Sequence, residues 1–328
     1  MKTFRRVLLW ILLLLVSPLF ILWIVVAQPT WAANEPSNQK VSPEALEKHV
    51  RMLSEDCFPR NYQNLDKLNQ AADYIADQFG RAGASVSFQE YSVNGKVYRN
   101  VIGSFGTDTD NLFVVGAHYD SHHLTPGADD NASGVAGLIE LPHLISQSNL
   151  RDENIQLVAY TLEEPPFFDT DYMGSYQHAQ SLFDAGVDLT GMIALEMIGY
   201  FSDEPGSQSY PASFLRTMYP NKGDFIGVIG TLSHREFTEQ IKIGMKGATD
   251  LPVYSLNAPK ALSGVDYSDH RSYWAFDYDA VMITDTAFYR NPNYHEKTDT
   301  ADTLDYDRMA KVVVSVFASL NRFLAEEK

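Results

Sequence analysis

The 328-residue sequence is poor in cysteine and in positive charge. Its single cysteine, Cys57, cannot form an internal disulfide, so no disulfide framework is expected to hold the fold. Lysine and arginine number 25 against 42 aspartates and glutamates, which gives a formal net charge of −17. No basic patch is available to neutralise a polyanion, so we expect no nucleic-acid partner. Phe58 and Pro59, beside the cysteine, indicate a helix end near the surface.

Glycine and proline are also too scarce for a collagenous or low-complexity protein, and no repeat of solenoid length is present. The chain is therefore expected to be globular. Residues 43–328 are numerous enough for one large domain with a sizeable core. Ser42 before Pro43 is a good helix N-cap and marks the expected start of this domain. The polar, proline-bearing residues 28–42 indicate a linker.

The N-terminus joins a basic flank to a long apolar run. Three basic residues lie within residues 1–6, and residues 7–27 carry no charge. Such a run spans a bilayer core of about 30 Å, and the positive flank places the rest of the chain outside the cytoplasm. Residues 1–27 are either a retained signal anchor, which we favour because apolar residues resume after Pro18, or a signal peptide cleaved near Ala27. Both alternatives predict an extracytoplasmic domain, on the periplasmic or extracellular side.

Strand and helix patterns alternate along residues 43–328. Apolar residues at helical spacing predict helices, short apolar runs predict buried strands, and Asn94-Gly95 predicts a hairpin. This alternation predicts a single α/β domain with a mixed, mainly parallel central sheet covered by helices on both faces. The expected helices are 44–53, 64–82, 132–146, 175–183, 233–245 and 304–326. The expected strands are 85–91, 97–104, 112–117, 155–162, 189–197, 224–229 and 280–284.

Histidines and carboxylates recur at the ends of these strands. Ligands of such sheets bind at the carboxyl ends of the strands, so these side chains are expected to lie close together. They are also the ligand types that zinc uses. The residues concerned are His118 and Asp120 after strand 112–117, Glu163 and Glu164 after strand 155–162, Glu196 at the end of strand 189–197, and His295 in the loop that follows strand 280–284.

Two aspartates have positions with a more specific meaning. Asp130 lies where a loop enters a helix, and its two oxygens could bridge two metal ions about 3.5–4 Å apart. Asp120 follows His118 by two residues on an extended chain, and could accept the second ring N–H of a ligating histidine. The alternative is that such acids cap helices or form solvated turns. That alternative does not explain why they recur at several strand ends.

These residues fall in motifs that resemble the co-catalytic two-zinc aminopeptidases of the bacterial leucyl aminopeptidase and aminopeptidase S-like family, which is related to glutamate carboxypeptidases and glutaminyl cyclases. The resemblance extends from about Pro43 to the C-terminus and implies the zinc exopeptidase, phosphorylase/hydrolase-like fold. The motifs, in the family's order, are HYDS at 118–121, GADDNASG at 127–134, EE at 163–164, LEMIG at 195–199, SDH at 268–270 and YHEKTDT at 294–300.

The resemblance implies a metal-dependent aminopeptidase with two Zn²⁺ per chain that acts on peptides with a free N-terminus. His118 would bind one metal with Glu196 as its carboxylate partner. Asp130 would bridge the two metals, and Glu164 and His295 would hold the second.

The resemblance also implies that Glu163 acts as the general base and that Asp120 orients His118. One departure is Glu196, since the family more often has aspartate there. Another is the stretch 165–173, which delays the Gly-Ser that usually follows the paired glutamates and is expected to shape the substrate entrance. Residues 203–223 form an insertion whose role as a lid stays open.

Weaker signals have ordinary explanations. The paired loop residues His122 and His123 are expected at the surface rather than as ligands, and the Asp269-His270 pair is expected to make structural hydrogen bonds. Arg290 is expected at the surface, with a grip on a substrate carboxylate as the alternative. Two other functions remain open: a glutaminyl cyclase, which would bind a single zinc, and a catalytically inactive ectodomain, which would lack ligands. Nothing in the sequence predicts the oligomeric state.

Overall fold

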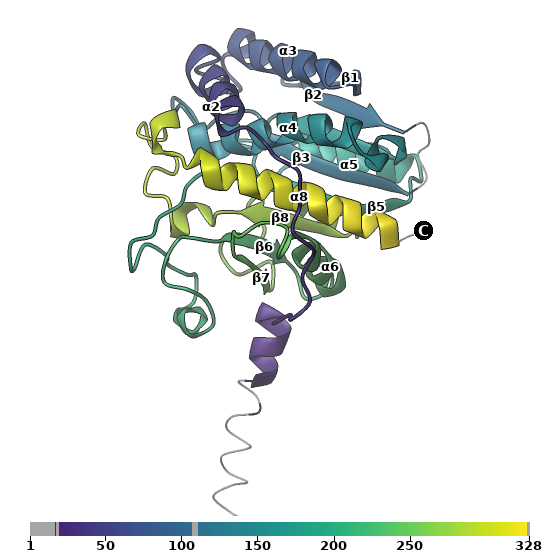
Figure 1. The fold of residues 1–328 in the computed structure, drawn as a ribbon. Coiled ribbons are helices and arrows are strands. Elements are labelled where there is room, and N and C mark those ends of the chain that lie inside the picture. Colours follow the sequence, from purple (N-terminus) through teal and green to yellow (C-terminus); the bar gives the residue numbers. More distant parts are fainter. Residues whose placement is uncertain (1–16, 18–19, 107–110, 327–328) are drawn as a thin grey trace, which may run out of the picture.

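A single eight-stranded sheet forms the centre of the protein (Figure 1). The computed structural model describes residues 17, 20–106 and 111–326. The strand order is β1-β2-β4-β3-β5-β8-β6-β7. The strands are β1 (Ser85–Val93), β2 (Lys96–Phe105), β3 (Leu112–His118), β4 (Ile155–Tyr160), β5 (Leu189–Glu196), β6 (Ile226–Gly230), β7 (Val253–Asn257) and β8 (Ala280–Thr284).

The sheet is mixed, and its central strands are parallel. Strands β4, β3, β5 and β8 pair in parallel, as do β6 and β7. The β1–β2, β2–β4 and β6–β8 pairs are antiparallel. Asn94 and Gly95 both have positive φ in the β1–β2 turn, as a two-residue hairpin of this sequence requires. Because the central strands are parallel, the carboxyl ends of β3, β4, β5 and β8 meet at one edge, where the polar residues of the motifs lie.

Helices cover both faces of the sheet. On one face lie α2 (Pro43–Arg51), α3 (Leu65–Arg81), α4 (Gly134–Ser146), α6 (Arg235–Met245) and the long α8 (Tyr306–Glu326), and on the other lie α5 (Gly174–Asp184) and α7 (His270–Trp274). Strand β3 shows why the central strands are apolar throughout. Phe113 and Val115 point into one hydrophobic cluster, whereas Leu112 and Val114 point into the other. The predicted architecture is confirmed.

Some elements differ from the sequence-based expectation. The edge strand β7 and the short helix α7 were not predicted, because five-residue elements carry little periodicity. Cys57 does follow a helix end, but its side chain is fully buried, so the expected surface position is wrong. It packs in the cluster beneath α2 and α3 rather than facing solvent.

The N-terminal segment lies mostly outside the described residues. Residues 20–27 form a helix that projects from the domain, shown in purple in Figure 1. In the part of the chain that the structure describes, we find no helix whose length and apolar character suit a membrane crossing. Residues 28–42 form no helix or strand and run past the C-terminal end of α6 and across α8 (Figure 1). Asn34 donates its backbone N–H to the Lys246 carbonyl at 2.7 Å, and Ser37 donates to the Ala248 carbonyl at 2.9 Å. The division at residue 43 stays a prediction.

Candidate metal centre

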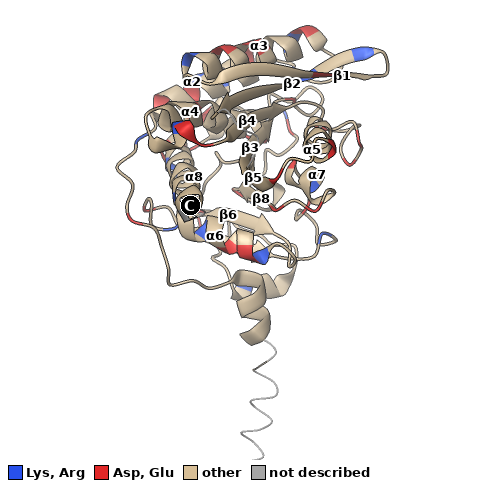
Figure 2. Ribbon diagram, turned by 90° about the vertical axis from the view of Figure 1, so that its right-hand side faces the viewer, with Lys and Arg blue, Asp and Glu red and all other residues tan. Residues whose placement is uncertain are grey.

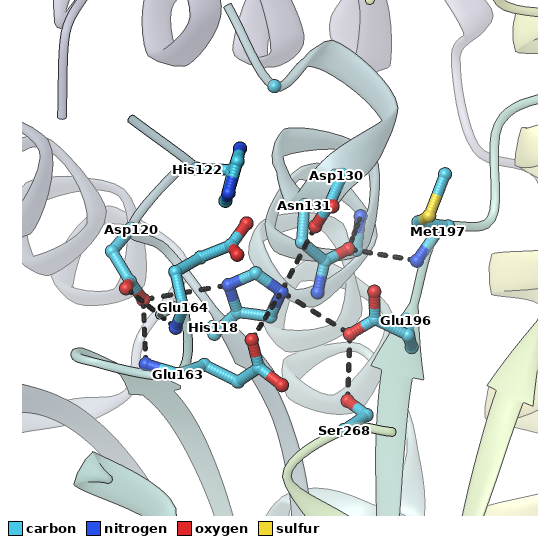
Figure 3. Close-up of polar contacts among 12 residues, drawn as sticks. His118, Asp120, His122, Asp130, Asn131, Glu163, Glu164, Glu196, Met197 and Ser268 are labelled. Atoms are coloured by element: carbon cyan, nitrogen blue, oxygen red, sulfur yellow. Dashed lines mark hydrogen bonds and ion pairs between the residues drawn. The ribbon is translucent and has the colours of Figure 1, made fainter. Parts of the chain in front are cut away.

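The strand ends bring the predicted residues together in a buried cluster (Figure 3). His118 is the last residue of β3, and Glu196 is the last residue of β5. Glu163 and Glu164 lie in the loop after β4. Asp130 precedes α4. His295 arrives from the loop after β8. Strands β3, β4 and β5 are parallel and end at the same edge of the sheet. Residues at or just after their carboxyl ends therefore meet here although they are distant in sequence.

Asp130 occupies the middle of the cluster, and each of its oxygens faces a different histidine. Oδ1 lies 3.3 Å from Nε2 of His118, and Oδ2 lies 3.1 Å from Nε2 of His295. Each histidine also faces a carboxylate of its own. Glu196 Oε2 is 3.3 Å from His118 Nε2, and Glu164 Oε2 is 3.3 Å from His295 Nε2. The five side chains therefore form two donor groups that share Asp130.

The electrostatics of this cluster suit cations. His118, Asp130, Glu164 and Glu196 are buried. Within the described part of the chain, Glu164 Oε1 and both ring nitrogens of His118 have no hydrogen-bond partner. Burial, with the charge of Asp130 added, raises the pKa of Glu164 to about 7, and burial also raises the pKa of Glu196. Carboxylates packed this closely in a buried site are costly unless cations compensate them. Two imidazoles and three carboxylates with unpaired atoms fit a pair of zinc ions.

Burial also raises the pKa of Asp130, but its close contacts with the imidazoles of His118 and His295 outweigh this effect and hold the pKa below its usual range. Asp130 is thus the carboxylate that stays ionised most readily, and it is the one shared by both groups. Glu163 behaves in the opposite way. Burial and the nearby carboxylates raise its pKa well above the usual range, although His118 acts against them. Its Oε2 lies 3.9 Å from His118 Nε2, at the edge of the cluster.

Asp120 connects the end of β3 to the loop after β4. Its two carboxylate oxygens accept the backbone N–H groups of Glu163 at 3.2 Å and Glu164 at 3.1 Å. Its Oδ1 also lies 3.5 Å from Nδ1 of His118, on the side of the ring that faces away from the cluster. This arrangement directs Nε2 of His118 towards Asp130 and Glu196, so Asp120 fixes both the histidine and the paired glutamates.

Two supporting residues were missed by the sequence analysis. Asp299 accepts the backbone N–H groups of Asp129 at 2.9 Å and Asp130 at 3.2 Å, and so holds the loop that carries the central carboxylate. Asn131 donates its side-chain amide to the Leu195 carbonyl at 2.8 Å, which ties the same loop to the end of β5. Both lie inside the quoted motifs, but the motifs alone do not tell which members contact one another.

The Ser-Asp-His motif supplies another supporting group. Ser268 donates its hydroxyl to Glu196 Oε2 at 2.7 Å, and it is fully buried (Figure 3). His270 contacts the Val265 carbonyl through Nε2 at 2.8 Å, a structural hydrogen bond of the expected kind. The expectation is wrong for Asp269, whose two buried carboxylate oxygens have no hydrogen-bond partner among the described residues. The motif thus reaches the cluster through its serine, which the sequence analysis did not single out.

His122 is not the surface residue that was expected. Its ring stacks on His295 with a centroid distance of 3.9 Å and an interplanar angle of 2°. Tyr294 also stacks on His295, at 3.8 Å and 17°. The ligand atoms of His122, Glu164 and His295 lie within 4.8 Å of one another. His123 is exposed, as expected. Among the described residues, no aspartate contacts Nδ1 of His295 as Asp120 contacts Nδ1 of His118, and the ring is held instead by stacking on His122 and Tyr294.

The expectation for Arg290 is also wrong. The residue is buried, and its guanidinium donates to Gln208 Oε1 at 2.9 Å and to the Tyr200 carbonyl at 3.3 Å. It also packs over the ring of Phe225. This contact could not be predicted from the sequence, because Gln208 belongs to the insertion 203–223 and lies 82 positions from Arg290. Arg290 therefore fastens the insertion to the domain.

An apolar pocket begins at Glu196 and extends towards β6 and β7. The insertion 203–223 forms one of its walls. Phe168, from the stretch 165–173, contacts Tyr267 at the rim with a centroid distance of 5.9 Å. Aromatic side chains make up much of its lining, namely Tyr210, Tyr219, Phe225, Tyr254, Tyr267, Phe288, Tyr289 and Tyr294.

Comparisons with known proteins identify relatives of this chain. The family model described as "Peptidase family M28" matches residues 100–319. The uncharacterized protein YfbL of Escherichia coli is 46% identical over 310 residues, which cover 92% of this chain and 95% of that protein. Leucine aminopeptidase 1 of Uncinocarpus reesii is 26% identical over 271 residues, which cover 77% of this chain and 63% of that protein.

Two solved structures share the fold. The zinc aminopeptidase BSAP of Bacillus subtilis has a TM-score of 0.66 at 14% identity, covering 85% of this chain and 94% of its own. The glutaminyl cyclase of Bacteroides thetaiotaomicron has a TM-score of 0.64 at 18% identity, covering 87% and 98%. At these identities the likeness concerns the fold alone. The family match spans most of the chain, and with the 46% identical relative it shows that this protein belongs to peptidase family M28.

Proposed function

We propose that the protein is a zinc-dependent aminopeptidase that removes N-terminal residues from peptides through a two-zinc site. The observation that carries this proposal is the position of Asp130, whose two oxygens face His118 and His295 separately. A carboxylate placed in this way can bridge two ions. The Bacillus subtilis neighbour shares the fold and is described as a zinc aminopeptidase, which supports zinc as the metal.

In this proposal His118 and Glu196 hold one zinc, Glu164 and His295 hold the other, and Asp130 belongs to both. Asp120 orients His118 through Nδ1. When bound, the zinc ions supply Lewis acidity to the scissile carbonyl and to the attacking water. The carboxylates around them also offer the negative charge that would attract the free amine of a peptide N-terminus.

Glu163 is the proposed general base. It lies beside the cluster rather than between the histidines, and Asp120 fixes its backbone. A buried carboxylate with a raised pKa is suited to accept a proton from the attacking water and to return it to the leaving amine. The geometry supports this division of roles between the adjacent glutamates, because Glu164 faces His295 whereas Glu163 belongs to neither candidate donor group.

The pocket next to Glu196 supports an apolar N-terminal residue, aromatic ones included. Its lining is mostly apolar, and three of its tyrosine hydroxyls, those of Tyr210, Tyr219 and Tyr289, already donate to backbone carbonyls. Tyr210 donates to the Pro220 carbonyl at 2.5 Å, and Tyr219 donates to the Ser255 carbonyl at 2.6 Å. A charged side chain would find few free polar partners in this pocket, so it would lose its hydration without compensation. We therefore expect apolar N-terminal residues to be released faster than charged ones.

The extracytoplasmic location remains part of the proposal and rests on the sequence of residues 1–27. The substrates would accordingly be peptides on the periplasmic or extracellular side.

The alternative is a glutaminyl cyclase, which the Bacteroides neighbour keeps open. It would use a single zinc, whereas this chain has a complete second donor group in His118, Asp130 and Glu196. The same complete set weighs against an inactive ectodomain.

The test is a digest of a peptide library by the purified protein, with and without a chelator, alongside Glu163→Gln. We expect stepwise loss of N-terminal residues, abolition by the chelator, and loss of activity in Glu163→Gln with the zinc content unchanged. Activity that survives the chelator or the substitution would contradict the proposal. Cyclisation of N-terminal glutamine without hydrolysis would favour the alternative.

A further inference from the structure

The helix of residues 20–27 exposes large apolar side chains that no other described part of the domain covers. Phe20 is 54% exposed, Ile21 59% and Ile24 43%. Figures 1 and 2 show this helix projecting away from the body of the protein, beyond β6 and β7. It is the end of the charge-free run that begins in the sequence at Val7. Apolar side chains presented to water in this way mark an interaction surface.

The end of this helix is fastened to the domain by a buried lysine. Lys242 is 3% exposed, and its ammonium group donates to the carbonyls of Ala27 and Gln28, the last backbone acceptors of the helix. Its third hydrogen bond goes to Ser255 Oγ on β7 at 2.9 Å. A cation at the C-terminus of a helix satisfies carbonyls that lack partners in the helix and interacts well with its dipole.

Gln28 fixes the direction of the chain as it leaves the helix. Its side-chain NH2 group donates to the Arg235 carbonyl at 2.8 Å, and its side-chain oxygen Oε1 accepts from Asn257 Nδ2 at 2.6 Å. The residue is buried, between the start of α6 and the end of β7. Because Lys242 and Gln28 bind the same junction from two sides, the helix is held in one orientation relative to the sheet rather than swinging on a linker.

Two further aromatic side chains are exposed near this end of the domain. Trp31, four residues after the helix, is 92% exposed, and Phe214 on the short helix η4 (Ser213–Thr217) is 45% exposed. A single groove is lined by Trp23, Trp31 and Met218, the residue that follows η4, so the C-terminal end of η4 lies close to the N-terminal segment. Tryptophan is the residue most favoured where a protein meets the headgroups of a membrane.

We propose that this end of the domain, formed by helix 20–27, Trp31 and Phe214, rests against a lipid bilayer. The apolar side chains of the helix insert into the bilayer. The hydrogen bonds of Lys242 and Gln28 orient the domain so that the β7 edge of the sheet lies towards the membrane. The net charge of −17 gives no attraction to anionic lipid, so apolar insertion provides the affinity.

The arrangement has a consequence for the apolar pocket. Tyr219 and Tyr254 line both that pocket and the groove beside Trp23 and Trp31. The far wall of the pocket is thus shared with the membrane-facing end. The opposite edge strand, β1, is seven strand spacings away, or about 34 Å at ~4.8 Å per spacing. The β1–β2 turn, with exposed Lys96, therefore marks the end that faces away from the bilayer.

The test places an environment-sensitive fluorophore at each end of the full-length chain, through Phe214→Cys and, as the matched control, Lys96→Cys. The native Cys57 is buried, so labelling of the folded protein reaches the introduced thiol. Each labelled protein is reconstituted into phosphatidylcholine vesicles with and without nitroxide-labelled lipid. We expect several-fold stronger quenching by the nitroxide at position 214 than at position 96. A third protein combines Phe214→Cys with Lys242→Met, which removes the hydrogen bonds that hold the end of the helix. Quenching at position 214 should be weaker in this protein.

Equal quenching at the two positions, or no association with vesicles, would overturn the proposal. A blue-shifted signal at position 214 without nitroxide quenching, accompanied by crosslinking between two copies, would assign this surface to a second copy of the chain instead. Neither readout depends on hydrolysis, so the failure of this proposal is distinguishable from failure of the proposed activity.

Discussion

Removal of the Ser268 hydroxyl tests whether Glu196 is a metal ligand. Ser268 donates to Glu196 Oε2 at 2.7 Å, the same oxygen that lies 3.3 Å from Nε2 of His118. The serine is therefore placed to aim this carboxylate at the donor group of His118 and Asp130. In Ser268→Ala the glutamate keeps its charge but loses the hydrogen bond that orients it.

The magnitude follows from the chemistry of that bond. A hydrogen bond to a charged group contributes roughly 1.5–3 kcal/mol, and loss of a residue that orients a ligand typically lowers metal affinity about 10- to 100-fold. His118 still faces Glu196 in the variant, so we expect the low end, about tenfold at one of the two zinc sites. The Ser268 bond also lowers the pKa of Glu196, against the larger effect of burial. Without it, protons compete better with zinc, so the deficit should grow as the pH falls.

The assay is a titration of the metal-free protein with zinc against a chromogenic chelator, at two pH values. Ser272→Ala is the control, since Ser272 is also a buried serine and contacts Ser175 Oγ at 2.9 Å rather than a carboxylate of the cluster. We expect one weakened zinc site in Ser268→Ala and none in Ser272→Ala. Two unchanged zinc affinities in Ser268→Ala would refute Glu196 as a ligand.

Three further predictions concern the other parts of the account. His122→Ala should weaken zinc binding at the site of His295 about tenfold, whereas His122→Phe should retain most of the affinity, because stacking on His295 needs an aromatic ring rather than a ring nitrogen. The same zinc titration measures both variants. Equal loss of affinity in both would show that His122 is itself a ligand. Zinc at a thousand times its dissociation constant should stabilise the folded protein by about 4 kcal/mol, and calorimetry that finds no change in the melting temperature after chelation would contradict the site. Burial lowers the pKa of His178 to about 4 in the folded protein. Below about pH 6.5 the unfolded chain therefore binds a proton at this histidine that the folded protein does not bind. The free energy of unfolding should fall as the pH drops towards 4, by up to about 3 kcal/mol. Chemical denaturation at pH 7 and pH 5 should show a smaller fall in His178→Gln, and parallel behaviour would exclude this cause.

Much of the fold could be predicted because its central strands have a simple signature. Strand β3 is buried on both sides, so its run from Leu112 to Ala117 is continuously apolar and stops at His118. The rule that ligands bind where parallel strands end then located the site before any motif was considered. The hairpin at Asn94-Gly95 was predictable for a local reason as well, since its turn requires positive φ.

The remainder depends on contacts between residues far apart in the chain. Ser268 and Glu196 are 72 positions apart, and Asp299 and Asp130 are 169 positions apart. No periodicity or spacing predicts that a particular serine will meet a particular glutamate. The stack of His122 on His295 is of the same kind, since it exists only once the β3 and β8 loops have been brought together by the sheet. Edge strand β7 was missed for a different reason, because a strand of five residues is too short to show a clear period in the sequence.

The most direct test of the central claim is the zinc content of the purified protein, measured by elemental analysis together with that of Asp130→Ala. The account predicts two zinc ions per chain in the wild type. It also predicts that Asp130→Ala loses tight binding at both sites, because Asp130 contributes one oxygen to each donor group. One zinc per chain, or an Asp130→Ala protein that still binds two zinc ions with wild-type affinity, would contradict a bridged pair.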